Sequence, residues 1–284
     1  MLGPTASGKS SLAEELADKF NATIINGDAF QMYRGMDIGT AKPTDTTRYE
    51  LLNLKNPDEE FGVGEYVLLA AARLQEHFNN NVNVILCGGT GLYIRALIEE
   101  YQDLSPAPSP ELRRELNERP EDELVLQLQT QFPEMAATTD LKNRIRVTRA
   151  LERCLAPKKK IRFSIPPFSK KKVAIVPEVT NTELNIQQRT SLMLQNGWVN
   201  EVKELLNLGY RPGNPGFRAI GYTAIVDFLY GDITEEEMVE TIEAETRNYA
   251  KRQRTWLRSE PDLEVFSNRI DALGATQAWI QSMH

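Results

Sequence analysis

The sequence has little cysteine and no long apolar run. Its 284 residues include two cysteines, Cys87 and Cys154, without the spacing of a disulfide framework or a zinc-binding pair, which favours a reducing, cytoplasmic setting. No apolar run reaches the roughly 18 residues of a membrane-spanning helix. The first residues also lack the pattern of a signal peptide, so we expect no membrane partner.

The chain is acidic overall, yet its basic residues are concentrated in two stretches. The formal net charge is −7, which by itself argues against a nucleic-acid partner. Residues 141–172 nevertheless hold twelve Lys and Arg against one acid, Glu152, and residues 245–258 hold five against one acid, Glu245. An acidic body with two basic stretches favours focused binding of a polyanion. The alternative is a pair of solvated helix faces with a Lys-rich loop.

The first motif lies at the very start of the chain. Residues 3–10 read GPTASGKS, the pattern of a phosphate-binding loop, in which backbone N–H groups and a helix N-terminus form a cradle for an anion. Lys9 adds a charge toward the terminal phosphate, and the Ser10 hydroxyl is a candidate ligand for Mg²⁺. Loops of this kind are typical of nucleotide-binding, and above all ATP-binding, proteins. A strand ordinarily precedes them, but only Met1 and Leu2 precede Gly3, so we expect upstream residues to be trimmed or missing.

Strands and helices alternate along the first hundred residues. Helical spacing over 10–20 is followed by a buried strand at 22–26, a helix at 65–78, a strand at 82–87 and a helix at 92–98. This alternation predicts an α/β fold with a parallel sheet, similar to the core of P-loop NTPases.

The alternation stops at residues 104–110 (LSPAPSP), which have the composition of a domain boundary. A charged, helical segment follows, and a buried strand then returns at 173–176. We therefore predict a core formed by residues 1–104 and 171–284, with a helical insertion at 105–170. After the strand, helices are expected at 182–195, 198–208, 220–230 and 234–258, which makes the C-terminal part helical.

Acidic side chains near the loop are few. ATPases and GTPases need an acid at the end of a neighbouring strand to hold Mg²⁺, but the strand at 82–87 ends in Gly-Gly-Thr. Asp28 follows the strand at 22–26, and the ends of parallel strands gather at one edge, so we expect Asp28 and Thr90 beside the bound phosphate. Asp28 could hold Mg²⁺ through water, accept a proton, or serve only as a cap.

Six stretches occur in an order that resembles the tRNA dimethylallyltransferases, also called isopentenyl-tRNA transferases. They are GPTASGKS, GDAFQMYRGMDIGTAKPT (27–44), GGTGLY (88–93), RVTRALE (146–152), FRAIGY (217–222) and YAKRQRTW (249–256). The resemblance implies transfer of a dimethylallyl group from dimethylallyl diphosphate to N6 of the adenine 3′ of the tRNA anticodon. The loop would then hold a diphosphate, which agrees with the missing acid.

The resemblance also assigns roles. Asp28 would be the base, Thr90 would position it or the amine, and Lys9 and Arg189 would stabilise the leaving diphosphate together with Mg²⁺ on Ser10. The residues expected to bind the diphosphate are Gly3, Thr5, Ala6, Ser7, Gly8, Lys9 and Ser10. The residues expected to bind tRNA, through its anticodon stem-loop, are Asp28, Ala29, Phe30, Gln31, Arg146, Arg149, Arg218, Arg247, Lys251, Arg252 and Arg254. Among these, the Gln31 amide would read the flipped adenine.

Some positions depart from the family pattern. Ala29 and Phe30 stand where the family often has other residues, residues 154–170 fit poorly, and an Arg usually found upstream of Arg189 is missing from 177–182. The absence of a zinc-finger tail favours a bacterial-type enzyme, and we expect a monomer.

Three rival functions stay open. An adenylate isopentenyltransferase would use a free nucleotide and would not need basic stretches. A small-molecule kinase would need ATP, an element that grips adenine and a mobile lid. An RNA-binding protein without catalytic activity would keep its function when Asp28 is replaced by alanine.

Overall fold

The computed structural model describes residues 1–101, 104, 110–155 and 161–283, and its chain divides into two compact units. The larger unit comprises residues 1–100 and 163–284, and the smaller one residues 101–162. The insertion predicted at 105–170 is therefore the smaller unit with shifted bounds, because residues 163–170 belong to the larger unit. Residues 105–109 and 156–160 of the predicted insertion, three lysines among them, lie outside the described residues.

The larger unit is built on parallel strands. Strand β1 (Thr23–Asn26) lies between β2 (Tyr49–Glu50) and β3 (Val84–Cys87), and β4 (Lys172–Ile175) pairs with β5 (Leu263–Phe266). Met1 and Leu2 lie between these two sheets. The N–H of Leu2 donates to the Val173 carbonyl at 2.8 Å, and the Met1 ammonium donates to the Leu86 carbonyl at 2.5 Å. Two residues thus occupy the strand position that precedes the loop.

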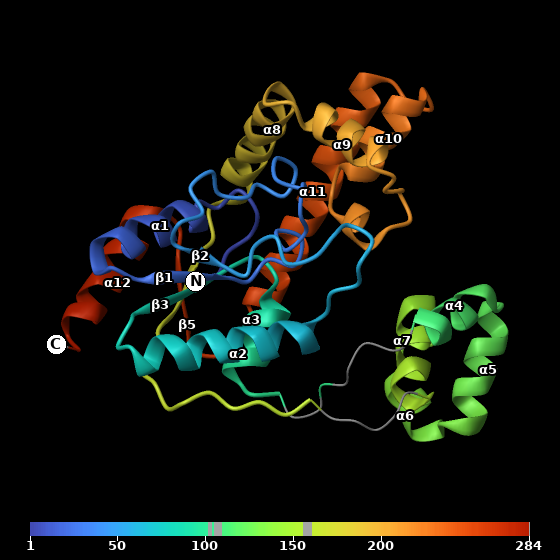
Figure 1. Cartoon of the computed structure of the whole chain (residues 1–284), viewed down its shortest axis with the longest axis horizontal. Helices are drawn as coiled ribbons and strands as arrows, with labels where there is room; N and C mark the ends of the chain where they lie inside the picture. Colours follow the sequence, from blue (N-terminus) through green and yellow to red (C-terminus); the bar gives the residue numbers. More distant parts are fainter. Residues whose placement is uncertain (102–103, 105–109, 156–160, 284) are drawn as a thin grey trace. The chain divides into compact units, whose positions relative to one another are not determined.

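Helices cover both faces of the layer that these parallel strands form (Figure 1). Leu12 and Leu16 of α1 (Lys9–Phe20) pack with Val173 and Ile175, together with Ala272 of α12 (Arg269–Gln281). On the opposite face, Leu2 and Ala174 pack with residues of α3 (Gly91–Ile98), which contacts α2 (Val63–Asn79). Alternate residues of β4 therefore serve opposite faces, as the pleat of a strand requires.

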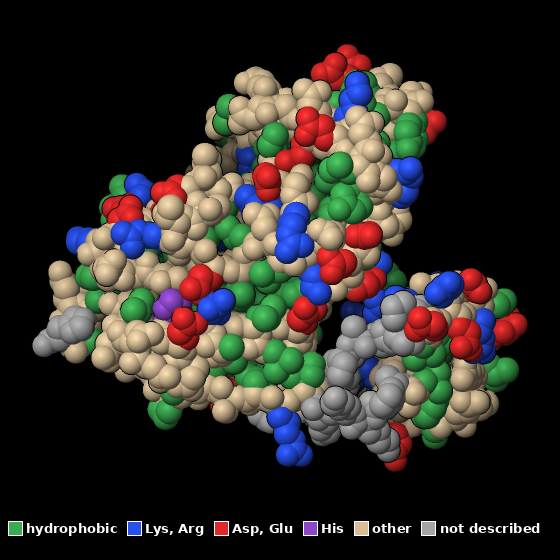
Figure 2. Space-filling view, viewed as in Figure 1, with side chains coloured by type: hydrophobic (Ala, Val, Ile, Leu, Met, Phe, Trp, Pro, Cys, Tyr) green, Lys and Arg blue, Asp and Glu red, His purple; other side chains and the backbone are tan. Residues whose placement is uncertain are grey.

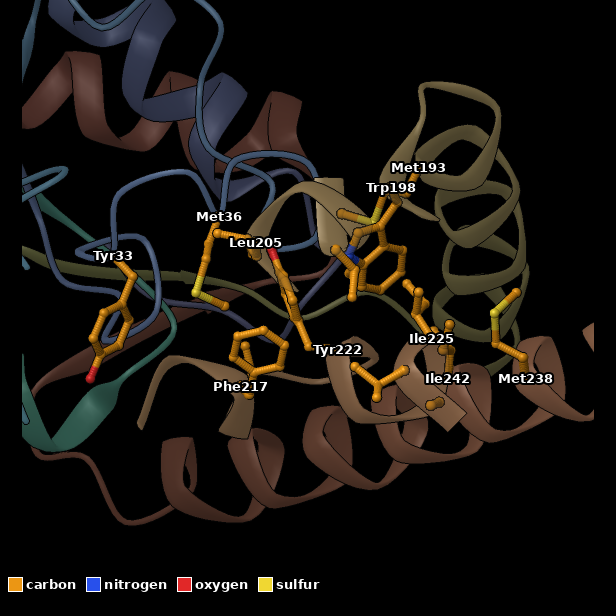
Figure 3. Close-up of a cluster of buried hydrophobic side chains, with 14 residues drawn as sticks. Tyr33, Met36, Met193, Trp198, Leu205, Phe217, Tyr222, Ile225, Met238 and Ile242 are labelled. Carbon is orange, nitrogen blue, oxygen red and sulfur yellow. The ribbon is translucent and has the colours of Figure 1, made fainter. Parts of the chain in front are cut away.

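The C-terminal part of this unit is helical. It contains α8 (Val179–Gln195), α9 (Trp198–Asn207), a 3₁₀ turn η1 (Pro215–Arg218), α10 (Tyr222–Tyr230) and α11 (Glu235–Leu257). Thr234 and Glu237 form a capping box at the start of α11. Trp198, Phe217 and Tyr222 lie at the centre of a buried apolar cluster (Figure 3), which fixes α9, α10 and α11 against one another.

The smaller unit is a set of short helices with its own core. Its helices are α4 (Pro110–Glu118), α5 (Glu121–Gln131), α6 (Pro133–Thr138) and α7 (Arg144–Leu155). Leu116, Leu124, Leu128, Val147 and Leu151 form its buried cluster. The Glu152 carboxylate is buried too, and it accepts hydrogen bonds from Arg113 at 2.8 Å and from Arg149 at 2.8 Å. This ion pair fixes α4 to α7.

The fold agrees with the predicted class, an α/β core with a helical insertion and a helical C-terminal part. Strands β2 and β5 and helix α12 were not predicted from the sequence. Strand β2 has only two residues, and α12 distributes its apolar residues around the helix, so neither gives a clear periodic signal. Among the described residues, every helix is too short or too polar to cross a membrane.

Candidate functional site

The phosphate loop joins Leu2 to α1, and two glycines shape it. A Cβ on Gly3 would lie 2.7 Å from the Ile175 carbonyl oxygen and 2.6 Å from Ser7 Oγ, so no larger residue fits there. Gly8 has a φ of 82°, a left-handed conformation that glycine adopts at little cost, and it caps the N-terminus of α1. The backbone N–H groups of residues 6–10 can therefore converge on an anion.

Helices α8 and α11 hold the loop in place. The buried Gln253 side chain of α11 accepts a hydrogen bond from Thr5 N–H at 2.7 Å and donates one to the Gly89 carbonyl at 2.9 Å. From α8, Arg189 donates to Thr5 Oγ1 at 3.0 Å and Asn185 donates to the Ala6 carbonyl at 3.2 Å. Gln253 thus joins the loop to the Gly-Gly-Thr turn after β3.

Two cations, Lys9 and Arg189, lie partly buried beside this loop. Burial lowers the pKa of Lys9, and it also lowers the pKa of Arg189. The nearby charge of Asp28 opposes both shifts. Neither cation forms an ion pair with another described residue, and a buried charge without a counter-charge is costly. The site is therefore prepared for an anionic ligand.

Asp28 lies at the end of β1 in a tight turn. Its Oδ1 accepts a hydrogen bond from Phe30 N–H at 3.0 Å, and its own N–H donates to Asn26 Oδ1 at 3.0 Å. The Thr90 hydroxyl accepts from Ala29 N–H at 3.1 Å, which fixes this turn to the turn after β3. Thr90 therefore contacts the turn that carries Asp28, as the sequence analysis expected of neighbouring strand ends.

Oδ2 of Asp28 faces Gly89 and Tyr249. A Cβ built on Gly89 would lie 3.4 Å from Asp28 Oδ2, 3.6 Å from the Tyr249 hydroxyl and 2.6 Å from Gln253 Nε2. Burial, and after it the charge of Asp28, raises the pKa of Tyr249 well above its ordinary value, so the phenol stays protonated near neutral pH. In this structure the Tyr249 hydroxyl donates to the Gly89 carbonyl at 3.4 Å.

Tyr249, Gln253 and Asn185 were missed as site residues. Ile242, Thr246, Tyr249 and Gln253 line the site from one stripe of α11, at spacings of four, three and four residues. The sequence analysis used that helix only for its basic residues. The polar side chains at that spacing were the available signal.

Two cavities meet at this loop. The smaller, of about 220 Å³, is lined by Asp28, Lys9, Tyr249 and Gln253, with apolar residues of α8 and α11. The larger, of about 680 Å³, is lined by residues 6–11 of the loop and by the segment from Asp37 to Thr46. Asp28 therefore lies on one side of the loop, and the backbone cradle lies toward the other.

The GDAFQMYRGMDIGTAKPT stretch forms a long loop that is held in shape by the side chains of Lys42 and Glu201. The Lys42 ammonium donates to the Tyr33 carbonyl at 2.5 Å, Asp37 Oδ1 at 2.6 Å and Asn53 Oδ1 at 2.6 Å. The Glu201 carboxylate accepts from the N–H groups of Asp37 and Ile38 at 2.7 and 2.6 Å. These contacts bring this long loop to the wall of both cavities.

The Gln31 side chain also forms hydrogen bonds within that loop. Its amide donates to the carbonyls of Thr40 and Ala41 at 3.0 and 3.1 Å. Gln31 and Phe30 both line the smaller cavity, and Ala29 contacts Thr90 as described. The prediction that Gln31 reads an adenine edge stays a prediction, but in this structure both bonds of its NH₂ group go to the loop.

The predicted tRNA contacts of the larger unit fall into two groups. Arg218, paired with Glu60 at 3.1 Å, and Arg252, stacked on the Tyr249 ring, line the smaller cavity. Arg247 is half-buried and pairs with Glu243 at 3.3 Å, while Lys251 is exposed. On the face in Figure 2, basic and acidic side chains of this unit are interspersed.

Unlike its basic neighbours on α11, Arg254 forms hydrogen bonds to the segment around the start of α8. Its guanidinium donates to Thr182 Oγ1 at 2.6 Å and to the Pro177 carbonyl, and it thereby joins α11 to the start of α8. From the sequence, Arg254 was expected to bind tRNA. The structure gives it a bracing contact within the fold.

In the smaller unit, α7 carries the two other predicted tRNA contacts. The Arg146 side chain is 67% exposed and lies 3.8 Å from Asp140. The Arg149 side chain is 43% exposed, and its guanidinium is held by the buried Glu152. Both are therefore available at the surface of this unit.

Taken together, the fold and the site define an α/β phosphate-loop protein with a partly buried anion site beside a carboxylate. A family model for IPP transferases matches residues 31–260. The chain is 39% identical to tRNA dimethylallyltransferase 1 of Citrifermentans bemidjiense, with 92% of this chain and 89% of the relative covered. It is 37% identical to tRNA dimethylallyltransferase of Geobacter sulfurreducens, with 92% and 89% covered.

Solved structures agree. The tRNA isopentenylpyrophosphate transferase of Bacillus halodurans matches with a TM-score of 0.73 and 32% identity over 99% of this chain and 94% of that one. A eukaryotic dimethylallyltransferase acting on tRNA shares the fold, with a TM-score of 0.79 and 22% identity over 98% and 76%. The chain belongs to the IPP transferase family.

Proposed function

We propose that this protein transfers the dimethylallyl group of dimethylallyl diphosphate to N6 of the adenine 3′ of a tRNA anticodon. The observation that carries the proposal is the pair of partly buried cations, Lys9 and Arg189, which lie beside an anion-binding loop and form no ion pair with a described residue, with Asp28 nearby. The family, with relatives named tRNA dimethylallyltransferase, supports this reaction over the rivals.

The two cavities suit two substrates. A diphosphate fits the loop amides, Lys9 and Arg189, which line the larger cavity. A purine base that has left its stack fits the smaller cavity, where Asp28, Tyr249 and Arg252 offer polar and stacking contacts. The reacting carbon would then lie at the loop, between the two.

The chemistry follows from this arrangement. The bond between the allylic carbon and the diphosphate oxygen breaks, and its electron pair leaves with the diphosphate. The new bond joins that carbon to N6, and the proton leaves N6 for Asp28. Lys9, Arg189 and the loop N–H groups stabilise the charge that develops on the leaving group, where fixed donors are most effective.

A Mg²⁺ ion fits the donor set at the loop. No cluster of three or more His, Cys, Asp or Glu among the described residues could hold a metal ion. Ser10 lines both cavities, and a single hydroxyl suits Mg²⁺, which keeps several waters and takes phosphate oxygens as ligands. When bound, the ion would neutralise charge on the diphosphate.

The partners follow from the same proposal. The basic residues Arg146, Arg149, Arg218, Arg247, Lys251 and Arg252 would contact the anticodon stem-loop. We further propose that the enzyme acts as a monomer in the cytoplasm.

A transfer assay tests the proposal. Protein, Mg²⁺ and labelled dimethylallyl diphosphate are mixed with an anticodon stem-loop, with AMP, or with no acceptor. We expect label on the stem-loop alone, and about a 10²-fold or greater loss with Asp28→Ala. Label on AMP would favour a nucleotide transferase, and consumption of ATP without prenyl transfer would favour a kinase. Transfer to no acceptor, with equal stem-loop binding by the wild type and Asp28→Ala, would leave only RNA binding.

A further inference from the structure

The two cavities at the loop share part of their walls. Six residues line both of them, namely Lys9, Ser10, Ala41, Pro43, Arg189 and Met193. Each of these lines both cavities, and we call the surface that the two cavities share the passage. A molecule that reaches from the loop cradle toward Asp28 must pass them.

This shared wall has two chemical halves. Lys9, Ser10 and Arg189 provide charge and a hydroxyl, which suit an anionic head. Ala41, Pro43 and Met193 provide only apolar surface, which suits a hydrocarbon. A donor that carries a diphosphate on a short hydrocarbon chain presents these two halves in the same order.

One face of α8 joins the halves. Ile186, Arg189, Thr190 and Met193 all line the smaller cavity, at the i, i+3, i+4 and i+7 spacing of a single helical face. Arg189 and Met193 are four residues apart, about 6 Å along the helix axis. Arg189 can thus hold the head of the donor while Met193 contacts its tail.

Two of the three apolar residues flank a lysine that is held by several hydrogen bonds. Ala41 and Pro43 flank Lys42, whose ammonium is fixed by the Tyr33 carbonyl, Asp37 and Asn53. The Met193 side chain is buried near Trp198 (Figure 3), and its unbranched thioether adapts to the shape of a neighbour. The space left for the hydrocarbon therefore depends on the residue at position 193.

We propose that Met193 determines which chain length of allylic diphosphate the enzyme accepts, by filling the passage beside the five-carbon group. This inference rests on the proposed function. A longer chain would have to occupy the volume of the Met193 side chain or enter the smaller cavity, where the acceptor base binds. Exclusion by packing of this kind is worth about 10-fold to 200-fold per methylene in hydrophobic pockets.

The test compares dimethylallyl diphosphate with geranyl diphosphate, the ten-carbon donor. Met193→Ala removes three heavy atoms from the passage, so we expect the ratio of kcat/KM for geranyl over dimethylallyl diphosphate to rise about tenfold or more. Met193→Phe, which fills more space, should move the ratio the other way. Affinity for inorganic diphosphate should stay within about twofold, because the anion-binding half is unchanged.

Met238→Ala is the matched control. Met238 belongs to the same buried cluster, lies toward Ile242 and lines neither cavity (Figure 3). It should lower thermal stability but leave the donor ratio unchanged. An unchanged ratio in both Met193 variants, or an equal shift in Met238→Ala, would overturn the proposal.

Binding of the three diphosphates in the absence of RNA, followed by tryptophan fluorescence, separates this inference from the proposed function. If the wild-type protein binds the donors but transfers nothing to tRNA, the proposed function fails. In that case the ratio of donor affinities still decides the role of Met193.

Discussion

Lys9 and Arg189 in the larger unit, and Arg146 and Arg149 in the smaller unit, carry the same charge in opposite surroundings. The first two are partly buried, lack an ion-pair partner among the described residues and belong to elements fixed by several hydrogen bonds. The other two lie at the surface of a helix, beside Asp140 and Glu152. A cation that is shielded from water favours a compact anion that fits directly against it. Exposure suits an extended polyanion whose binding depends on salt.

The largest effect should come from Arg189. Arg189→Ala removes one of the two partly buried cations, and we expect kcat to fall about 10²–10³-fold, the usual cost of losing one fixed donor to a developing charge. Single-turnover transfer to the stem-loop measures it. Arg73→Ala on the exposed face of α2 is the control and should be neutral. A loss of less than about threefold with Arg189→Ala would contradict the buried-cation argument.

A substitution of Gln253 tests whether the hydrogen bonds that hold the phosphate loop contribute to stability and to diphosphate binding. Gln253→Leu leaves Thr5 N–H and the Gly89 carbonyl without their partner, so we expect a loss of about 1–3 kcal/mol in the free energy of unfolding. Diphosphate affinity should fall as well, because the loop loses its support. Denaturant unfolding and calorimetric titration measure the two effects. Gln187→Leu on the exposed side of α8 should change neither, and equal behaviour of the two variants would count against the role of Gln253.

The pH dependence of diphosphate binding tests the burial of Lys9. Burial lowers its pKa, and a bound anion raises that pKa again, so affinity is highest below the Lys9 pKa and falls as the pH rises through it. The fall should begin at a lower pH than an exposed lysine would allow. Titrations from neutral to alkaline pH, corrected for the ionisation of free diphosphate, measure it. Lys9→Arg should abolish this fall, and the same profile in both proteins would refute the assignment.

The smallest effect is expected at the exposed cations. Arg146→Ala should weaken stem-loop affinity only a few-fold and reduce the slope of log K against log salt by about one, without a change in stability. Arg254→Ala should do the reverse, with lower stability and an unchanged slope, because its guanidinium braces α8. Fluorescence anisotropy at several salt concentrations distinguishes them. If both substitutions reduced the slope equally, Arg254 would contact RNA as Arg146 does, and its assignment to the fold would be wrong.

The sequence predicted the parts of this protein that depend on local pattern. The alternation of strands and helices, the loop at 3–10 and the positions of Asp28 and Thr90 at neighbouring turns all follow from periodicity and from the geometry of parallel sheets. The roles of Gln253, Asn185 and Arg254 could not be predicted in this way. Each depends on a contact between α8, α11 and the loop, and a polar residue on a helix carries no mark of the partner it finds far away in the chain.

Gln31 and Lys42 illustrate the same limit. Both belong to the GDAFQMYRGMDIGTAKPT stretch, which the sequence analysis used as a recognition motif. Lys42, together with Glu201 from a helix more than 150 residues later, gives this loop its shape. A motif can therefore be specific to a family because it folds one loop, and not only because it contacts a substrate.

The two residues that join the sheets bear on how the chain folds. Leu2 pairs with the strand at 172–175, which in turn pairs with the strand at 263–266, so the central sheet closes only through contacts that span most of the chain. The helices of the smaller unit contact one another within a short stretch of sequence, and local contacts form faster than distant ones. We expect amides of α5 and α7 to gain protection from hydrogen exchange before those of β4 during refolding. The anion site, which begins at residue 3 of the chain, would thus be among the last parts to assemble.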